Sequence, residues 1–285
     1  MPRQQSPNKT KKAIIDKVLH KNILICPNCK SPLFKVGNSL KCQHNHSFDL
    51  AKEGYVNLLL PNEKKTKDPG DDAVMVSSRE AFLKKGYYEK LQTEILEIVK
   101  KLNCNTILDA GCGTGYYINL AEYQNLDVIG IDISKHAIKK AAKEKGAASF
   151  LVASIFNLPF QDETIDAVIN IFAPKPEKEF LRVLKDGGVV IEVTPGENHL
   201  IELKKAIYSD QTRKNQEKTS FSELALIDFQ RLTYQSKVKE NDDLTQLVMM
   251  TPYWYKGGEK NLNALKECNV DTITFDFIIK LWKKQ

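Results

Sequence analysis

Short apolar runs alternate with amphipathic stretches between residues 105 and 196. The runs "NTILDAG", "DVIGIDI", "ASFLVAS", "IDAVINIFAP" and "VVIEVTPG" are typical of buried strands. Between them, "YYINLAEYQ", "KHAIKKAAKEKG" and "PEKEFLRVLKDGG" keep the apolar spacing of helices. Strands that alternate with helices of this length predict βαβ units. We therefore expect an α/β domain with a mostly parallel sheet and helices on both faces.

The pattern is less regular on either side of this region. Apolar residues keep helical spacing from Ala73 to Leu102, and residues 200–245, rich in lysine and glutamine, also follow a helical pattern. Near the C-terminus, "TITFDFIIKLW" predicts a last strand, and residues 11–20 predict a short helix. The chain thus divides into a basic extension (1–21), a small module (22–60), a linker with connecting helices (61–104) and the α/β domain (105–285).

Composition narrows the class of protein only moderately. Six cysteines occur without an apolar secretory segment, which favours thiols and metal ligands in a reducing cytoplasm over disulfides. There is no apolar run of about eighteen residues, so we expect no membrane span. The net charge of +6 is explained by solubility alone. The basic excess before residue 22, where Asp16 is the acidic residue, tilts the balance slightly toward a nucleic-acid partner.

The small module has the spacing of a metal site. Cys26 and Cys29 are separated by two residues, as on a tight knuckle, and Cys42 and His46 are separated by three. The residues between the pairs predict a hairpin that turns at Gly37-Asn38. Four thiolate or imidazole ligands would fill the shell of a structural zinc ion. His44 competes with His46, but one residue between Cys42 and His44 strains the knuckle, so we expect His44 to be a bystander.

A glycine-rich loop follows the first strand of the α/β domain. "ILDAGCGTGYY" contains Asp109, Gly111, Gly113 and Gly115, which allow a ligand to approach the backbone closely. Asp132 ends the next strand, where a carboxylate can accept both hydroxyls of a ribose. A glycine loop alone also fits nicotinamide or flavin binding, although here the third glycine comes one residue earlier than in that fingerprint.

These motifs resemble the class I S-adenosylmethionine-dependent methyltransferases. "LPFQDETIDAVI" and "LKDGGVVIEV" stand where that class carries its LPF motif, an aspartate before the fourth strand, and a glycine turn. The resemblance implies a Rossmann-like domain that binds S-adenosylmethionine. The class often has an acidic residue before LPF that holds the adenine amino group. Here "VASIFNLPF" offers Ser154 at that place.

A narrower resemblance extends over nearly the whole chain after residue 22. The segments "CPNC", "HSFDLAKEGYVNLL", "REAFLKKGYYEKL", "IFAP", "TPGENHLIELKKAIY", "MTPYWY" and "FDFIIKLW" are similar to the RlmA-type ribosomal RNA guanine-N1 methyltransferases. The resemblance implies zinc on Cys26, Cys29, Cys42 and His46 in a zinc-ribbon-like module. It also implies cofactor contacts at Tyr88, Gly113, Thr114 and His199, a hairpin of large-subunit (23S) rRNA as partner, and a homodimer.

The target base is expected where the fourth strand of the α/β domain ends. We predict that Phe172 stacks on the guanine and that the Asn170 region contacts its edge, although Phe172 is equally explained as a core residue. Lys30, Lys35 and Lys41 on the zinc module are candidates for contacts with the RNA backbone. Two alternatives stay open at this point: a class I methyltransferase that acts on a small molecule, and a non-catalytic nucleic-acid-binding protein.

Overall fold

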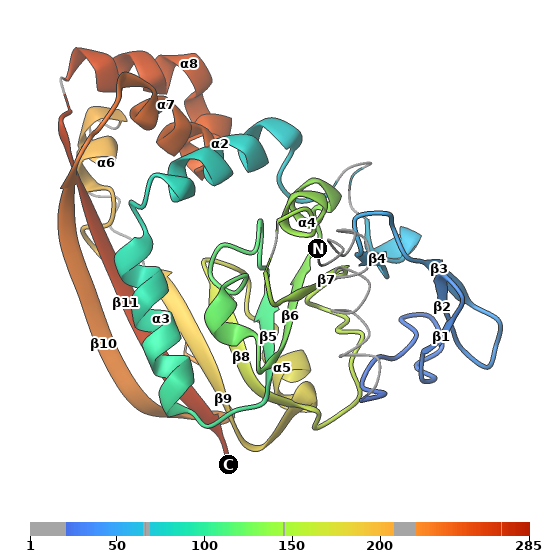
Figure 1. The fold of residues 1–285 in the computed structure, drawn as a ribbon. Helices are drawn as coiled ribbons and strands as arrows, with labels where there is room; N and C mark the ends of the chain where they lie inside the picture. Colours follow the sequence, from blue (N-terminus) through green and yellow to red (C-terminus); the bar gives the residue numbers. More distant parts are fainter. Residues whose placement is uncertain (1–20, 65, 67–68, 145, 208–219, 269) are drawn as a thin grey trace, which may run out of the picture.

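A computed structural model of the chain describes residues 21–64, 66, 69–144, 146–207, 220–268 and 270–285. Their strands form a small and a large sheet (Figure 1). The small sheet is antiparallel and contains β1 (Phe34–Val36), β2 (Ser39–Lys41) and β3 (Ser47–Asp49). The β1–β2 hairpin turns at Gly37 and Asn38, as predicted. The predicted basic extension, with its helix over residues 11–20, lies outside the described residues.

The large sheet has eight strands in the order β10-β11-β9-β8-β5-β6-β7-β4. Six neighbours are parallel to one another: β9 (Leu184–Pro195), β8 (Ile165–Ile171), β5 (Thr106–Ala110), β6 (Asp127–Asp132), β7 (Ser149–Val152) and β4 (Val56–Asn57). β11 (Thr272–Lys284) runs antiparallel to both β9 and β10 (Leu224–Lys237). The expected mostly parallel sheet is confirmed.

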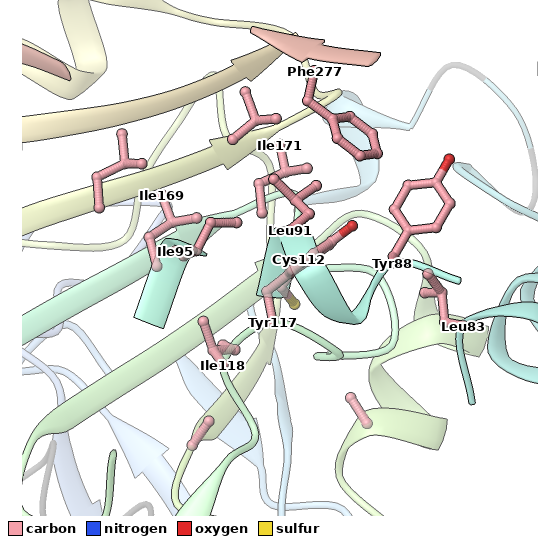
Figure 2. Packing of buried hydrophobic residues seen from close by; sticks show 14 of the residues in the cluster. Leu83, Tyr88, Leu91, Ile95, Cys112, Tyr117, Ile118, Ile169, Ile171 and Phe277 are labelled. Atoms are coloured by element: carbon pink, nitrogen blue, oxygen red, sulfur yellow. The ribbon is translucent and has the colours of Figure 1, made fainter. Parts of the chain in front are cut away.

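Both faces of this sheet are covered by hydrophobic side chains. Successive side chains of a strand point to opposite faces, so neighbouring residues enter different clusters. Ile107 of β5 belongs to one hydrophobic cluster and Leu108 to the other. Helix α3 (Glu89–Lys101) and α4 (Lys135–Ala141) contribute to the first cluster, and α5 (Glu177–Val183) to the second. Figure 2 shows two residues of α3 beside β8: Ile95 lies next to Ile169, and Leu91 next to Ile171. Each such buried side chain contributes about 1.5–3 kcal/mol.

A layer of helices stands over one end of the large sheet (Figure 1). It consists of α2 (Ala73–Lys84), α6 (Ile201–Ile207), α7 (Asn241–Met249) and α8 (Pro252–Glu267). α2 contacts α7, and α8 contacts both α6 and α7. Short 3₁₀ turns, η1 (Pro61–Glu63) and η2 (Ala121–Tyr123), lie in the connections. No helix of the described ranges has the length and apolar character needed to cross a membrane.

The helical pattern from Ala73 to Leu102 is interrupted in the structure. The chain leaves α2 at Lys84 and enters α3 at Glu89, and between them Gly86 adopts φ +82°. A positive φ stops a right-handed helix and is easily adopted only by glycine. The break turns the chain from the helical layer down onto the face of the sheet. It also places Tyr88 directly before α3.

Other helix predictions were too long or wrong. The helix expected for residues 116–124 is a series of turns that ends in η2, and the helix expected from Lys135 ends at Ala141. The helix expected for residues 176–188 ends at Val183, because β9 already starts at Leu184. Within residues 200–245, α6 (Ile201–Ile207) and α7 (Asn241–Met249) agree with the helical prediction, and residues 208–219 lie outside the described part of the chain. The prediction fails for β10, which pairs with β11 and whose exposed and half-buried residues alternate from Phe229 to Lys237. That alternation is the period of a strand at the edge of a sheet.

Candidate metal centre and cofactor site

The small module brings four potential metal ligands together. The ligand atoms of Cys26, Cys29, Cys42 and His46 all lie within 4.8 Å of one another. Nδ1 of His46 is 3.3 Å from Sγ of Cys42, and Sγ of Cys29 is 3.6 Å from Sγ of Cys42. Tetrahedral zinc with Zn–S bonds of about 2.3 Å separates its ligands by about 3.8 Å, so these residues fit one zinc ion with a closed shell. His44 points elsewhere, with Nδ1 at 3.2 Å from Oγ of Ser31.

The thiols of this cluster differ in their tendency to ionise. The backbone N–H of Ser31 lowers the pKa of Cys29 to about 5, so this thiol is ionised at neutral pH. Burial raises the pKa of Cys26 to about 11. A bound cation reverses that effect, because a coordinating thiol is deprotonated outright. The donor set therefore suits a divalent soft metal such as zinc.

The small module (residues 22–60) is hydrogen-bonded to the loop that follows β7. The N–H of Ile25 donates to the carbonyl of Pro159 (3.0 Å), and Nζ of Lys30 donates to Oδ1 of Asn157. β4, which ends the module, pairs with β7 as the edge strand of the large sheet. Leu24 of the module packs in the same hydrophobic cluster as Phe160. The module and the α/β domain therefore share one core.

The glycine loop after β5 needs its glycines. Gly111, Gly113 and Gly115 have φ of +92°, +54° and +75°. A Cβ on Gly111 would lie 2.7 Å from Cβ of Ala173, and one on Gly115 would lie 2.7 Å from the ring of Phe150. These contacts are too short for any side chain. Gly111 and Gly115 therefore let the loop pack tightly against the protein, while the space above Gly113 is open enough for a cofactor to approach the backbone.

Two carboxylates lie beneath this loop. Asp132 at the end of β6 accepts the N–H of Gly113 at 2.9 Å and the N–H of Ser134 at 2.8 Å, and burial raises its pKa. Asp109 at the end of β5 is buried, and its Oδ2 has no hydrogen-bond partner among the described residues. Burial and the charge of Asp132 raise the pKa of Asp109 to about 8. An unpaired buried carboxyl group fits a site that receives a polar, cationic ligand.

Tyr88 and His199 are buried and lie against each other. Oη of Tyr88 lies 3.4 Å from Nε2 of His199, and Nδ1 of His199 accepts the backbone N–H of Asp276 at 3.3 Å. The imidazole is neutral, because burial lowers its pKa to about 3. Since Nδ1 accepts, Nε2 carries the proton and faces the tyrosine oxygen. The structure thus brings together two side chains that are far apart in the sequence.

Phe172 lies beside this pair. Its ring centroid is 5.8 Å from that of His199 and 6.5 Å from that of Tyr88, and 40% of the residue is exposed. Its φ of +53° is rare for a residue with a bulky side chain, and such strain clusters at functional sites. Asn170 is buried, and its Nδ2 donates to the carbonyls of Ala110 (3.3 Å) and Pro174 (3.0 Å). Asn170 therefore holds the turn on which Phe172 stands.

The remaining predicted cofactor residues flank the glycine loop. Ser154 is buried after β7, and its Oγ accepts the N–H of Phe156 at 3.2 Å. Thr114 lines a cavity of about 200 Å³ together with Gln92 of α3 and Glu80 of α2. Sequence reasoning missed Arg79 of α2, whose Nη1 comes within 3.9 Å of a Cβ placed on Gly113. No local pattern marks that arginine, since α2 reaches the loop only in the folded chain.

Comparison with protein families adds two matches that together cover most of the chain. A family model described as "Methyltransferase domain" matches residues 102–249, and one described as "RlmA, N-terminal", a zinc ribbon, matches residues 24–67. The second match contains all four residues of the metal cluster. The first contains the glycine loop and both carboxylates beneath it.

Two individual proteins match most of the length of the chain. The chain is 31% identical over 266 residues to a "23S rRNA (guanine(748)-N(1))-methyltransferase" of Streptomyces fradiae, covering 87% of this chain and 93% of that protein. It is 32% identical over 276 residues to YxjB of Bacillus subtilis (strain 168), covering 91% and 96%. Among solved structures, YcgJ of Bacillus subtilis matches at 17% identity with a TM-score of 0.45, over 66% of this chain and 96% of that one.

Proposed function

The chain belongs to the RlmA-type family of 23S rRNA (guanine-N1)-methyltransferases, and we propose that it transfers a methyl group from S-adenosylmethionine to N1 of a guanine in a stem-loop of 23S rRNA. One observation carries this proposal. The Cys/His cluster shares one core with β5, the strand that leads into the glycine loop, and the chain aligns with 93% of the length of a named rRNA methyltransferase. A methyltransferase for a small metabolite has no need of the first module.

The residues around the glycine loop would bind and align the cofactor, which supplies an electrophilic methyl group when bound. Transfer from a sulfonium is an in-line displacement, so the protein mainly orients the reactants and excludes water. We assign the methionine part of the cofactor to the glycine loop and its ribose to Asp132. The full set of proposed cofactor residues is Tyr88, Asp109, Gly111, Gly113, Thr114, Gly115, Asp132, Ser154 and His199.

The guanine would enter beside Phe172. This ring is half-exposed, faces the Tyr88–His199 pair and is fixed by a strained turn, so it can stack on a base that has left its helix. Asn170 acts as a positioning residue, because its amide holds the carbonyl of Pro174 at the end of that turn. His199 is a poor acceptor for the N1 proton, since its pKa lies near 3 and its Nε2 faces Tyr88.

The zinc ion has a structural task in this proposal. Cys26, Cys29, Cys42 and His46 would occupy all four tetrahedral positions and leave no place for water or substrate. Residues 22–60 would select the RNA, with Lys30, Lys35 and Lys41 near its backbone, and residues 105–285 would carry out the transfer. An rRNA substrate implies a cytoplasmic enzyme. The homodimer implied by the family stays a prediction, which light scattering at several protein concentrations tests.

The proposal is tested by incubating the protein with labelled S-adenosylmethionine and unmodified 23S rRNA. N1-methylation blocks Watson–Crick pairing, so reverse transcription should stop at one guanine. Asp132→Ala should abolish the stop, whereas Lys100→Met, at an exposed ion pair on α3 far along the helix, should preserve it. Cofactor binding without RNA labelling would favour a small-molecule substrate. No cofactor binding at all would leave only a nucleic-acid-binding protein.

A further inference from the structure

Arg79 places a permanent positive charge directly over the glycine loop. It lies on α2, and its Nη1 is 3.9 Å from a Cβ placed on Gly113. Nη1 pairs with the carboxylate of Asp71, and Nη2 donates to the carbonyl of Met250 at 3.1 Å. None of the predicted cofactor residues carries a positive charge at neutral pH. The guanidinium therefore lies beside the glycine loop, but the proposed set of cofactor residues gives it no role.

Arg79 also acts electrostatically on two of the proposed cofactor residues. Its charge acts to lower the pKa of Asp132 and that of Tyr88, against the effect of their burial. Asp132, at the end of β6, accepts the N–H of Gly113, and Tyr88 lies directly before α3. A cation this close to Gly113 attracts an anion that lies over the glycine loop.

S-Adenosylmethionine has one anionic group at neutral pH, the carboxylate of its methionine part. The carboxylate of Asp132 and the unpaired Oδ2 of Asp109 suit the sulfonium and the ammonium of the cofactor but not its carboxylate. A guanidinium has five N–H donors in a planar fork that matches a carboxylate. We propose that Arg79 binds the carboxylate of the cofactor and that this carboxylate takes the place of Asp71. This inference rests on the proposed methyltransferase function.

The contacts around Asp71 permit such an exchange. Its backbone carbonyl accepts the hydroxyl of Ser134 at 2.7 Å, which holds the loop in place independently of the carboxylate. The carboxylate itself is part-exposed, with 26% of the side chain accessible, so it can turn to water. Met250 keeps the guanidinium oriented meanwhile. Asp71 thus neutralises Arg79 until the cofactor arrives.

The competing explanation is a structural clasp, in which Arg79 only ties α2 to the loop at Asp71. The two explanations differ for ligands that lack one group. Decarboxylated S-adenosylmethionine keeps the adenosine, the sulfonium and the amine but has no carboxylate. If Arg79 binds the carboxylate, its replacement should weaken S-adenosylmethionine selectively. If it is a clasp, both ligands should weaken equally.

The test is titration calorimetry of the full chain with both ligands. We expect Arg79→Met to weaken S-adenosylmethionine about 10- to 100-fold, the value of one charged hydrogen-bonded pair, and decarboxylated S-adenosylmethionine less than about threefold. Lys100→Met should change neither. Arg79→Lys, which preserves the charge without the fork, should fall between. Asp71→Asn should leave or raise the affinity for S-adenosylmethionine, because it removes the competitor.

Equal losses for both ligands in Arg79→Met and Arg79→Lys, or a loss in Asp71→Asn as large as in Arg79→Met, would overturn the inference in favour of the clasp. If Arg79→Met lowers the melting temperature, the comparison of the two ligands in Arg79→Lys distinguishes carboxylate binding from a structural clasp. The proposed function is judged separately: a wild-type protein that binds neither ligand contradicts the methyltransferase itself, whereas one that binds both equally contradicts only the role of Arg79.

Discussion

Asp109→Asn should make the stability of the protein less sensitive to pH. Asp109 is 1% exposed and its pKa is raised from 3.8 to about 8, mainly by burial and further by Asp132. The folded protein therefore holds this proton more tightly than the unfolded chain. The stabilisation is fully present below about pH 4 and is lost as the pH rises toward 8. An asparagine has no such proton.

The size of the effect follows from the same shift. Between the two pKa values, each pH unit changes the free energy of unfolding by about 1.4 kcal/mol for one proton. From pH 5 to pH 8 the wild-type protein should thus lose about 4 kcal/mol through Asp109. Relative to the wild type, the variant should gain the same amount over this range. The comparison between pH values cancels any constant cost of packing the amide.

Denaturant unfolding at pH 5, 6, 7 and 8, followed through tryptophan fluorescence, measures this difference. Asp166→Asn is the matched control, because Lys185 and the N–H groups of Asn105 and Thr106 lower the pKa of Asp166 despite its partial burial. Its titration lies below pH 4, so its effect should be constant from pH 5 to 8. A constant difference for Asp109→Asn as well would refute the reasoning, since it would mean that Asp109 is already ionised in the fold.

Three further results are expected. Removal of the metal with a chelator should lower the melting temperature and also weaken cofactor binding, because the module is bonded to the loop after β7; unchanged cofactor affinity would contradict this coupling. Phe172→Ala should lower the rate of RNA methylation by about 5- to 100-fold, the value of one stacked base, with cofactor affinity preserved; equal rates would make Phe172 a packing residue. Gly115→Ala should destabilise the fold by about 1–3 kcal/mol in urea, because its Cβ would meet Phe150 at 2.7 Å; a change below about 0.5 kcal/mol would show that the loop can yield.

The parts of the structure that the sequence predicts well are those encoded over a few neighbouring residues. The βαβ alternation follows from the periodicity of apolar residues, and the order of strands from β5 to β9 confirms it. The two-residue spacing between Cys26 and Cys29 is sufficient to direct both sulfur atoms toward one metal ion, independently of the rest of the fold. The turn at Gly37 is equally local. In each of these features the short-range geometry of the backbone leaves few alternatives.

The parts that were missed depend on distant partners. β10 is rich in polar residues and becomes a strand because β11 offers a row of partners along its full length. Gly86 interrupts a continuous helical pattern. The break separates α3, on the sheet, from α2, whose position depends on packing in the helical layer. Arg79 reaches the glycine loop also through a long-range contact, since α2 must pack close to Gly113. Neither periodicity nor spacing contains this information.

The shared core of the two regions changes how the division of labour should be tested. β4 is the edge strand beside β7, and Leu24 packs with Phe160, so deletion of residues 22–60 would expose the core of the α/β domain. A loss of activity after deletion would then report unfolding rather than loss of RNA selection. Charge-removing variants at Lys35 and Lys41 avoid this, because both lie on the small sheet. If those residues bind phosphates, each variant should reduce the salt dependence of RNA binding by about one unit of slope and leave cofactor affinity unchanged.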